Sequence, residues 1–118
     1  MTELVNRYLA IWHETDADAR RTAITEIWSE HARVCTGDND YTGRAAIEAR
    51  VAAAHDKWVA QEGFVFRPLG GADIHHDGVR IRWEMVPAGG GEAASAGVQF
   101  LLLDADGLVR FDYQFIDS

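Results

Sequence analysis

The first half of the chain carries apolar residues at helical spacing. In residues 3–13 the apolar side chains recur at intervals of one, three and four, which places them on one face of a helix. A second helix is predicted over residues 18–28, with Thr15-Asp16 as its cap. A third is predicted over residues 43–60, capped by Thr42. Its apolar stripe is Ile47, Val51, Ala54 and Trp58.

The pattern changes to strand-like alternation after Gly63, and one short strand is expected earlier, at residues 33–36. Asp77-Gly78 and the stretch 104–107 (DADG) are typical hairpin turns. The later strands are predicted at residues 64–69, 72–76, 79–86, 96–103 and 108–116. This order of elements predicts a single α+β domain over residues 1–118, with helices gathered on one face of an antiparallel sheet.

The predicted strands differ in how many faces they bury. Residues 79–86 alternate apolar with mostly charged side chains, so one face meets the helices. Residues 98–103 are apolar except for Gln99, and the last strand is rich in aromatics. Because a helix layer covers only one face, we expect a homodimer through the outer face of the sheet.

Charge and composition restrict the classes of molecule that the protein is expected to bind. The net charge of −8 argues against nucleic acid and against anionic membrane surfaces, which both require a basic patch. No apolar run approaches the length that spans a bilayer, and no secretory leader pattern is present at the start. We therefore expect a cytoplasmic protein. Its single cysteine, Cys35, is expected to be a small buried hydrophobe.

Four stretches together resemble one known superfamily. They are RYLAIWHETDADAR, IWSEHARV, YTGRAAIEA and LLLDADGLVRFDYQFID, in that order along the chain. Their order and spacing resemble the NTF2-like superfamily, and within it the SnoaL-like branch that includes polyketide cyclases. The resemblance implies a cone-shaped fold, also called cystatin-like, in which a curved sheet wraps around three N-terminal helices and leaves a deep pocket. Dimers through the sheet are common in that superfamily.

The resemblance also implies positions for a reactive site. Tyr8 falls where the isomerases of the superfamily have an oxyanion-binding tyrosine, and Gln99 falls where they have a hydrogen-bond-donating acid. Thr36 falls at the usual general base, yet a threonine does not take a proton from carbon near neutral pH. Thr36 is either a hydrogen-bonding ligand contact or a β-branched strand residue.

The last strand offers a further acid. Asp112 lies between aromatics, where partial desolvation would suit it to acid or base work, and Gln114 follows it by two residues. Alternation alone would turn Phe111, Tyr113 and Phe115 toward the helices, whereas the resemblance would turn Asp112 and Gln114 toward the pocket. A slip of one residue exchanges these two orientations. Asp112 also has an ordinary interpretation, as a solvated residue or one paired with an arginine.

The histidines are not spaced in the way that metal ligands usually are. His55 on the third helix is a candidate proton shuttle, although an exposed helix histidine is commoner. His75 and His76 are adjacent in a predicted strand, so we expect them on opposite faces and unable to share a metal ion. We expect no metal site and no cofactor.

The four tryptophans are candidates for the wall of the pocket. Trp12, Trp28, Trp58 and Trp83 would converge on the interior of a cone, although ordinary core packing explains each one singly. We expect a small apolar, oxygen-bearing molecule as partner. One hypothesis is a cofactor-free isomerase, cyclase or dehydratase in which Tyr8 and Gln99 polarise an oxygen. The alternatives are a non-catalytic ligand-binding or dimeric interaction module, and a structural domain with a filled interior.

Overall fold

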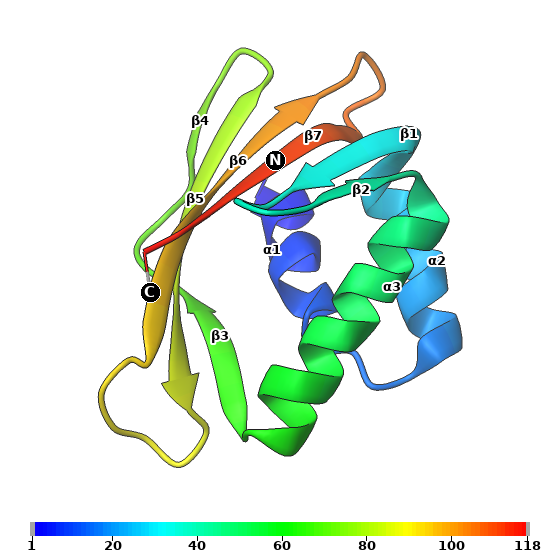
Figure 1. Cartoon of the computed structure of the whole chain (residues 1–118). Helices are drawn as coiled ribbons and strands as arrows, with labels where there is room; N and C mark the ends of the chain where they lie inside the picture. Colours follow the sequence, from blue (N-terminus) through cyan, green and yellow to red (C-terminus); the bar gives the residue numbers. More distant parts are fainter. Residues whose placement is uncertain (1, 118) are drawn as a thin grey trace.

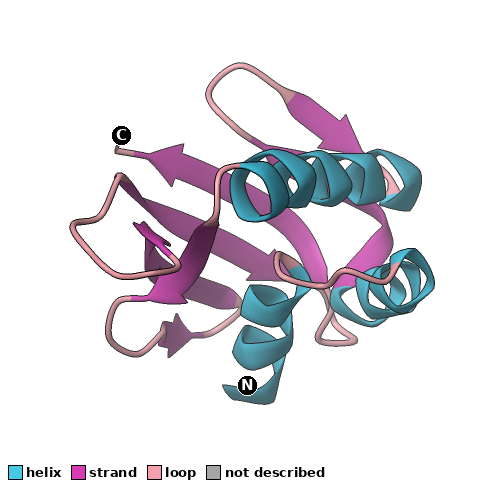
Figure 2. Cartoon of the chain, turned by 90° about the horizontal axis from the view of Figure 1, so that it is seen from below, coloured by secondary structure: helices cyan, strands magenta, loops and turns pink. Residues whose placement is uncertain are grey.

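The protein is a curved sheet with its helices gathered on the concave side (Figure 1). The computed structural model describes residues 2–117. Within that range the elements are α1 (Thr2–Ile11), α2 (Ala17–Ile27), β1 (Trp28–Cys35), β2 (Asp40–Thr42), α3 (Arg44–Ala54), the π-helical segment η1 (His55–Gln61), β3 (Phe64–Pro68), β4 (Asp73–His75), β5 (Gly78–Pro87), β6 (Ser95–Leu103) and β7 (Val109–Ile116). Figure 2 shows the helices covering one face of the strands, as the sequence predicts.

The described strands form one sheet in the order β2-β1-β7-β6-β5-β3, with β4 added beside β5. The predicted α+β fold, with a cone-like sheet around three helices, is confirmed. One detail of it is wrong, because β1 runs parallel to β7 while the other pairs are antiparallel. A parallel pair needs a long connection, and the chain between β1 and β7 includes α3 and five further strands.

The junction between α2 and β1 differs from the prediction. Asp16 caps α2 as expected, because its side chain accepts the backbone N–H of Asp18 at 3.1 Å. The helix ends at Ile27, and Trp28 is already extended, with φ −102° and ψ 143°. The first strand is therefore eight residues long instead of four.

The start of α3 is set by a glycine. The predicted Thr42 cap is wrong, because Thr42 ends β2 and donates its hydroxyl to Asp40. Gly43 takes the cap position with φ 88°, a conformation that side chains rarely adopt. The predicted helix then runs to residue 61, but its last part, His55–Gln61, is π-helical. This segment carries Trp58 toward the sheet.

The core lies between the helices and the concave face of the sheet. The predicted stripe on α3 is buried at Ile47, Val51 and Ala54. It packs in one cluster with α2 and with the inward side chains of β5, β6 and β7: Ile24, Ile27, Val79, Ile81, Leu101 and Val109. Burying a side chain of this size contributes about 1.5–3 kcal/mol, so this cluster provides the main stabilisation of the domain.

A bulge in β7 decides which side chains face inward. On β6, the adjacent residues Leu102 and Leu103 pair with Phe111 and Val109 of β7. Arg110, between these two partners, is therefore an extra residue on β7. The alternation therefore shifts by one after Val109. Asp112 is fully buried and Gln114 is buried, while Phe115 is 59% exposed. The orientation implied by the resemblance is thus the one observed.

The β4–β5 turn is displaced by one residue from its predicted position. His75 pairs with Gly78, so His76 and Asp77 form the turn, and His76 has φ 50°. The two histidine rings therefore come together instead of pointing to opposite faces, with Nδ1 atoms 3.1 Å apart. The predicted Asp104–Gly107 turn is confirmed, because Asp104 Oδ1 accepts the backbone N–H groups of Asp106 and Leu108.

The outer face of the sheet carries an apolar strip across β6 and β7. Three cross-strand pairs form it: Val98 with Phe115, Phe100 with Tyr113, and Leu102 with Phe111. Phe100 is 40% exposed, and Phe111 stacks on Tyr113. The homodimer through this face stays a prediction, which sedimentation velocity would decide. Cys35 lies beside this strip and is half-buried, so the prediction of a buried cysteine is wrong.

Among residues 2–117, no helix is long and apolar enough to cross a membrane.

Candidate functional site

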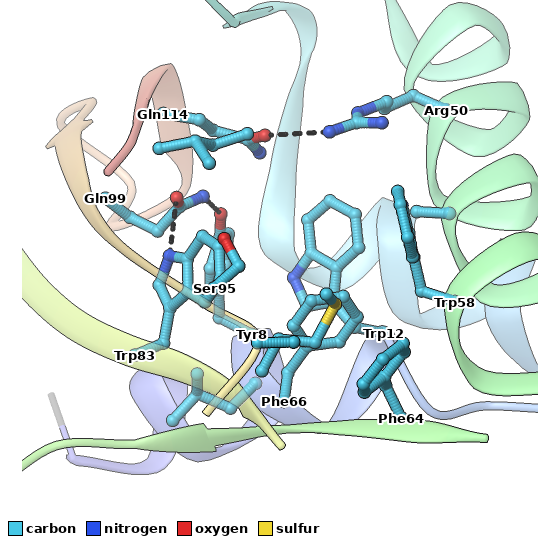
Figure 3. Close-up of a pocket in the computed structure, with 15 residues that line it drawn as sticks. Tyr8, Trp12, Arg50, Trp58, Phe64, Phe66, Trp83, Ser95, Gln99 and Gln114 are labelled. Carbon is cyan, nitrogen blue, oxygen red and sulfur yellow. Dashed lines mark hydrogen bonds between the residues drawn. The ribbon is translucent and has the colours of Figure 1, made fainter. Parts of the chain in front are cut away.

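A cavity of about 440 Å³ opens between the helices and the sheet (Figure 3). The residues around it come from α1 and the turn after it, α3, η1, the strands β3, β5, β6 and β7, and the loop before β6. Within the described residues its wall consists of Tyr8, Leu9, Trp12, Arg50, Ala54, Trp58, Phe64, Phe66, Trp83, Met85, Ala94, Ser95, Gln99, Gln114 and Ile116. The wall is therefore mainly aromatic and aliphatic, with few polar groups, as in pockets for small organic molecules.

Buried polar side chains form a hydrogen-bonded chain at one side of this cavity. Trp83 Nε1 donates to Gln99 Oε1 at 3.0 Å, and Gln99 Nε2 donates to Tyr8 Oη at 2.5 Å. Tyr8 Oη in turn donates to Asp112 Oδ2 at 2.6 Å. Figure 3 shows the links from Trp83 through Gln99 to Tyr8. Asp112 is not part of the cavity wall and lies behind Tyr8.

The direction of every bond in this chain follows from one donor. An indole N–H can only donate, so Gln99 must present its oxygen to Trp83 and its amide N–H groups to Tyr8 and Asp112. The Tyr8 hydroxyl then accepts from Gln99, and its single proton goes to Asp112. While Asp112 is ionised, Tyr8 has no proton left for a molecule in the cavity.

Burial raises the pKa of Asp112 from its ordinary value to about 7, because a carboxylate is poorly solvated inside the core. The Tyr8 hydroxyl, Gln114, the positive charge of Arg50 and the Trp28 indole oppose this rise. Neither Gln114 Nε2 nor Trp28 Nε1 reaches hydrogen-bonding geometry with a partner among the described residues. Half-buried Cys35 also lies close enough to interact with the Asp112 charge.

The protonation of Asp112 therefore controls the donor at Tyr8. When Asp112 holds a proton, its own O–H can donate to Tyr8 Oη, and the Tyr8 proton can turn toward the cavity. The pKa of Tyr8 is raised well above its ordinary value, first by burial and then by the Asp112 charge. Tyr8 thus stays protonated and acts as a neutral donor. The network can present a hydrogen bond to an oxygen atom in the cavity and store a proton behind it.

Three of the four predicted tryptophans reach the cavity. Trp12, Trp58 and Trp83 line it, whereas Trp28 is fully buried in the core against Tyr8 and lies outside the wall. Trp83 lies over Gly97, its partner on β6, which leaves space for the indole because it has no side chain. The predicted polar contacts Gln99 and Gln114 both line the cavity.

Two other predicted residues lie elsewhere. Thr36 lies in the loop after β1, where its hydroxyl accepts the backbone N–H of Asn39, so it shapes the loop and does not reach the main cavity. His55 is buried at the start of η1, with Nδ1 3.7 Å from Asp56, and is also absent from the wall. A shuttle role for His55 inside the cavity is therefore not supported.

Arg50 is a site residue that the sequence reading missed. It extends from α3 across the cavity, and its Nη2 donates to Gln114 Oε1 at 3.3 Å (Figure 3). Among the described residues that line the cavity, it is the only one with a charged side chain. The sequence does contain a pattern that indicates it. Arg50 lies three residues after Ile47 and four residues before Ala54, which places it on the buried side of the helix.

Within residues 2–117, no group of three or more His, Cys, Asp or Glu side chains is arranged to hold a metal ion.

Comparison with solved structures shows which known proteins share this fold. No family model matches the sequence, and no curated protein matches it. The chain is similar to a protein from Agrobacterium tumefaciens C58 described as a candidate isomerase of the SnoaL-like family. The TM-score is 0.87 at 26% identity, over 98% of this chain and 96% of that one. This chain therefore has the fold of the NTF2-like superfamily and is similar to a SnoaL-like protein.

Two further solved structures show the same fold. One is a candidate polyketide cyclase from Sinorhizobium meliloti, with TM-score 0.72 and 20% identity over 97% of this chain and 94% of that one. The other is an NTF2-like protein from Exiguobacterium sp. 255-15, with TM-score 0.73 and 18% identity over 98% of each chain. The NTF2-like and SnoaL-like resemblance predicted from the sequence is confirmed.

Proposed function

We propose that the protein binds a small, largely apolar molecule in its cavity and holds an oxygen atom of that molecule through Tyr8. One observation carries the proposal: an aromatic cavity of about 440 Å³ has, in its wall, a tyrosine hydroxyl bonded to a fully buried carboxyl group. A buried network of this kind costs stability when its acid ionises, so a ligand-binding role accounts for it better than packing does.

A filled interior does not account for these residues. Trp12, Trp58 and Trp83 stand around the cavity and leave its space open. A ligand there would exchange water for aromatic contacts, and Tyr8 would supply the polar contact that fixes its orientation.

A second candidate function is cofactor-free proton transfer of the isomerase, cyclase or dehydratase type. The buried Asp112, bonded to Tyr8 at 2.6 Å, favours it, because it can hold a proton at neutral pH. Two structural neighbours are described as a candidate isomerase and a candidate polyketide cyclase. Within the described residues, however, neither a carboxylate nor an imidazole lines the cavity. Tyr8 would then be the group that touches the substrate, with Asp112 acting through it.

Calorimetry with a neutral aromatic ketone tests the binding proposal. Para-phenylacetophenone offers an apolar biphenyl body and one acceptor oxygen. We expect it to bind the wild-type protein, and we expect Tyr8→Phe to weaken binding roughly tenfold, since one buried hydrogen bond is lost.

The matched control is Tyr113→Phe, which removes a hydroxyl from the outer face of the sheet, outside the cavity. It should leave the affinity unchanged. A wild-type protein that does not bind the ketone, or equal affinities for Tyr8→Phe and wild type, would contradict the proposal.

A further inference from the structure

Arg50 stands where the apolar cavity meets a second hollow. This recess, of about 500 Å³, is lined by Thr36, Gly37, Asp38, Asn39, Tyr41, Arg50, Gln114, Phe115, Ile116 and Asp117. Arg50, Gln114 and Ile116 belong to both walls, so the guanidinium group separates a mainly aromatic space from a polar one.

The guanidinium group has donors to spare. Within the described chain it makes one hydrogen bond, to the Gln114 side chain, and it lies 6.0 Å from the ring centre of Trp12 and 5.7 Å from that of Tyr41. Its Nε atom is buried and has no hydrogen-bond partner among residues 2–117. A buried N–H without an acceptor is destabilising, so this position favours a ligand that brings an acceptor.

Other arginines of the described chain are used differently. Each of five forms an ion pair with a carboxylate at the surface: Arg7, Arg21, Arg33, Arg67 and Arg80. Arg50 makes no ion pair within residues 2–117, although it is half-buried between two aromatic rings. The nearby carboxylate of Asp112 is already bonded to Tyr8 and Gln99.

We propose that the ligand is an apolar carboxylic acid whose carboxylate pairs with Arg50, while its apolar body fills the aromatic cavity. This inference rests on the ligand-binding function proposed above and adds the chemical class of the ligand. The guanidinium fork matches the two oxygens of a carboxylate, and pairing in a partly desolvated position is stronger than at the surface. Asp38 lines only the recess, so its negative charge favours a ligand carboxylate placed on the cavity side of Arg50.

A pair of probes with the same apolar body tests the assignment. Para-phenylbenzoate ends in a charged carboxylate, whereas para-phenylacetophenone ends in a neutral ketone. In calorimetry we expect the wild-type protein to bind the benzoate roughly tenfold more tightly than the ketone or better. We expect Arg50→Met to weaken benzoate binding by a similar factor and to change ketone binding little, which also reports that the variant is folded.

Arg82→Met is the matched control, because it removes the same charge from an exposed position on β5 outside both hollows. It should leave the preference for the benzoate intact. The inference is overturned if the wild type binds the benzoate no better than the ketone, if Arg50→Met weakens both probes equally, or if Arg82→Met has the same effect. If the wild type binds neither probe, the proposed ligand site is contradicted as well. If the wild type binds the ketone but does not prefer the benzoate, only the assignment of a carboxylic acid as ligand is contradicted.

Discussion

Asp112 is the residue on which the chemistry of the cavity depends. It is fully buried, and it accepts the Tyr8 proton that would otherwise be available to a ligand. Its neighbours come from five elements: Tyr8 from α1, Trp28 from β1, Arg50 from α3, Gln99 from β6 and Gln114 from β7. Only one of them, Arg50, carries a positive charge, so the raised pKa of Asp112 follows from burial.

A pH dependence of ligand affinity follows from this residue. A ketone that accepts the Tyr8 proton requires a protonated Asp112, so binding takes up a proton, and affinity should fall as pH rises through about 7. In Asp112→Asn the amide can donate to Tyr8 at every pH. We expect that variant to bind para-phenylacetophenone with an affinity that changes little between about pH 6 and pH 8.

Unfolding measurements on the same two proteins provide an independent check. The pKa of Asp112 is higher in the folded state than in the unfolded chain, so the folded state binds the extra proton and loses stability as pH rises from about 4 to about 7. The unfolding free energy of Asp112→Asn should lack this loss, which amounts to a few kcal/mol at most. Parallel pH profiles for wild type and variant would contradict the assignment.

At the scale of elements, the β5–β6 pair positions Trp83 in the cavity wall. A side chain at Gly97 would place its Cβ 2.5 Å from Trp83 Cζ2 and 2.6 Å from the backbone oxygen of Phe115. We therefore expect Gly97→Ala to lower the unfolding free energy by about 1–3 kcal/mol, measured by urea denaturation, because either the indole or a strand must move.

Gly78→Ala is the control for this substitution. Gly78 lies in β5 of the same strand pair, but a Cβ there would meet its nearest neighbour, the Phe100 ring, at an ordinary 3.4 Å. Its unfolding free energy should change by less than that of Gly97→Ala. Equal losses for the two variants would show that Trp83 does not depend on the open space at Gly97.

The elements also show how far the sequence could predict the fold. The helical stripe of Ile47 and Val51 and the alternation in β5 predict the elements correctly, because both periods reflect one buried face. The bulge at Arg110 has no such signal, since a single extra residue changes the pairing without changing the composition. For the same reason the inward turn of Asp112 followed from the family resemblance and could not be derived from alternation.

For the whole molecule, the resemblance to NTF2-like proteins and most of the residues around the cavity could be predicted from the sequence. Tyr8, Gln99 and Gln114 do line or approach one cavity. Trp28 was expected there but lies in the core, because α2 ends one residue early and Trp28 starts β1. Arg50 was missed because a charged residue within an apolar stripe is usually taken as solvent-exposed.

The four indole N–H groups allow the central claim to be tested on the intact protein. Trp12, Trp58 and Trp83 line the cavity and Trp28 does not, so Trp28 is an internal reference. The measurement is heteronuclear NMR of the indole N–H signals, assigned with single Trp→Phe variants, during titration with para-phenylacetophenone. We expect the signals of Trp12, Trp58 and Trp83 to shift at saturation, with Trp28 shifting least. Unchanged spectra at saturating ketone, or a shift confined to Trp28, would contradict a ligand site in this cavity.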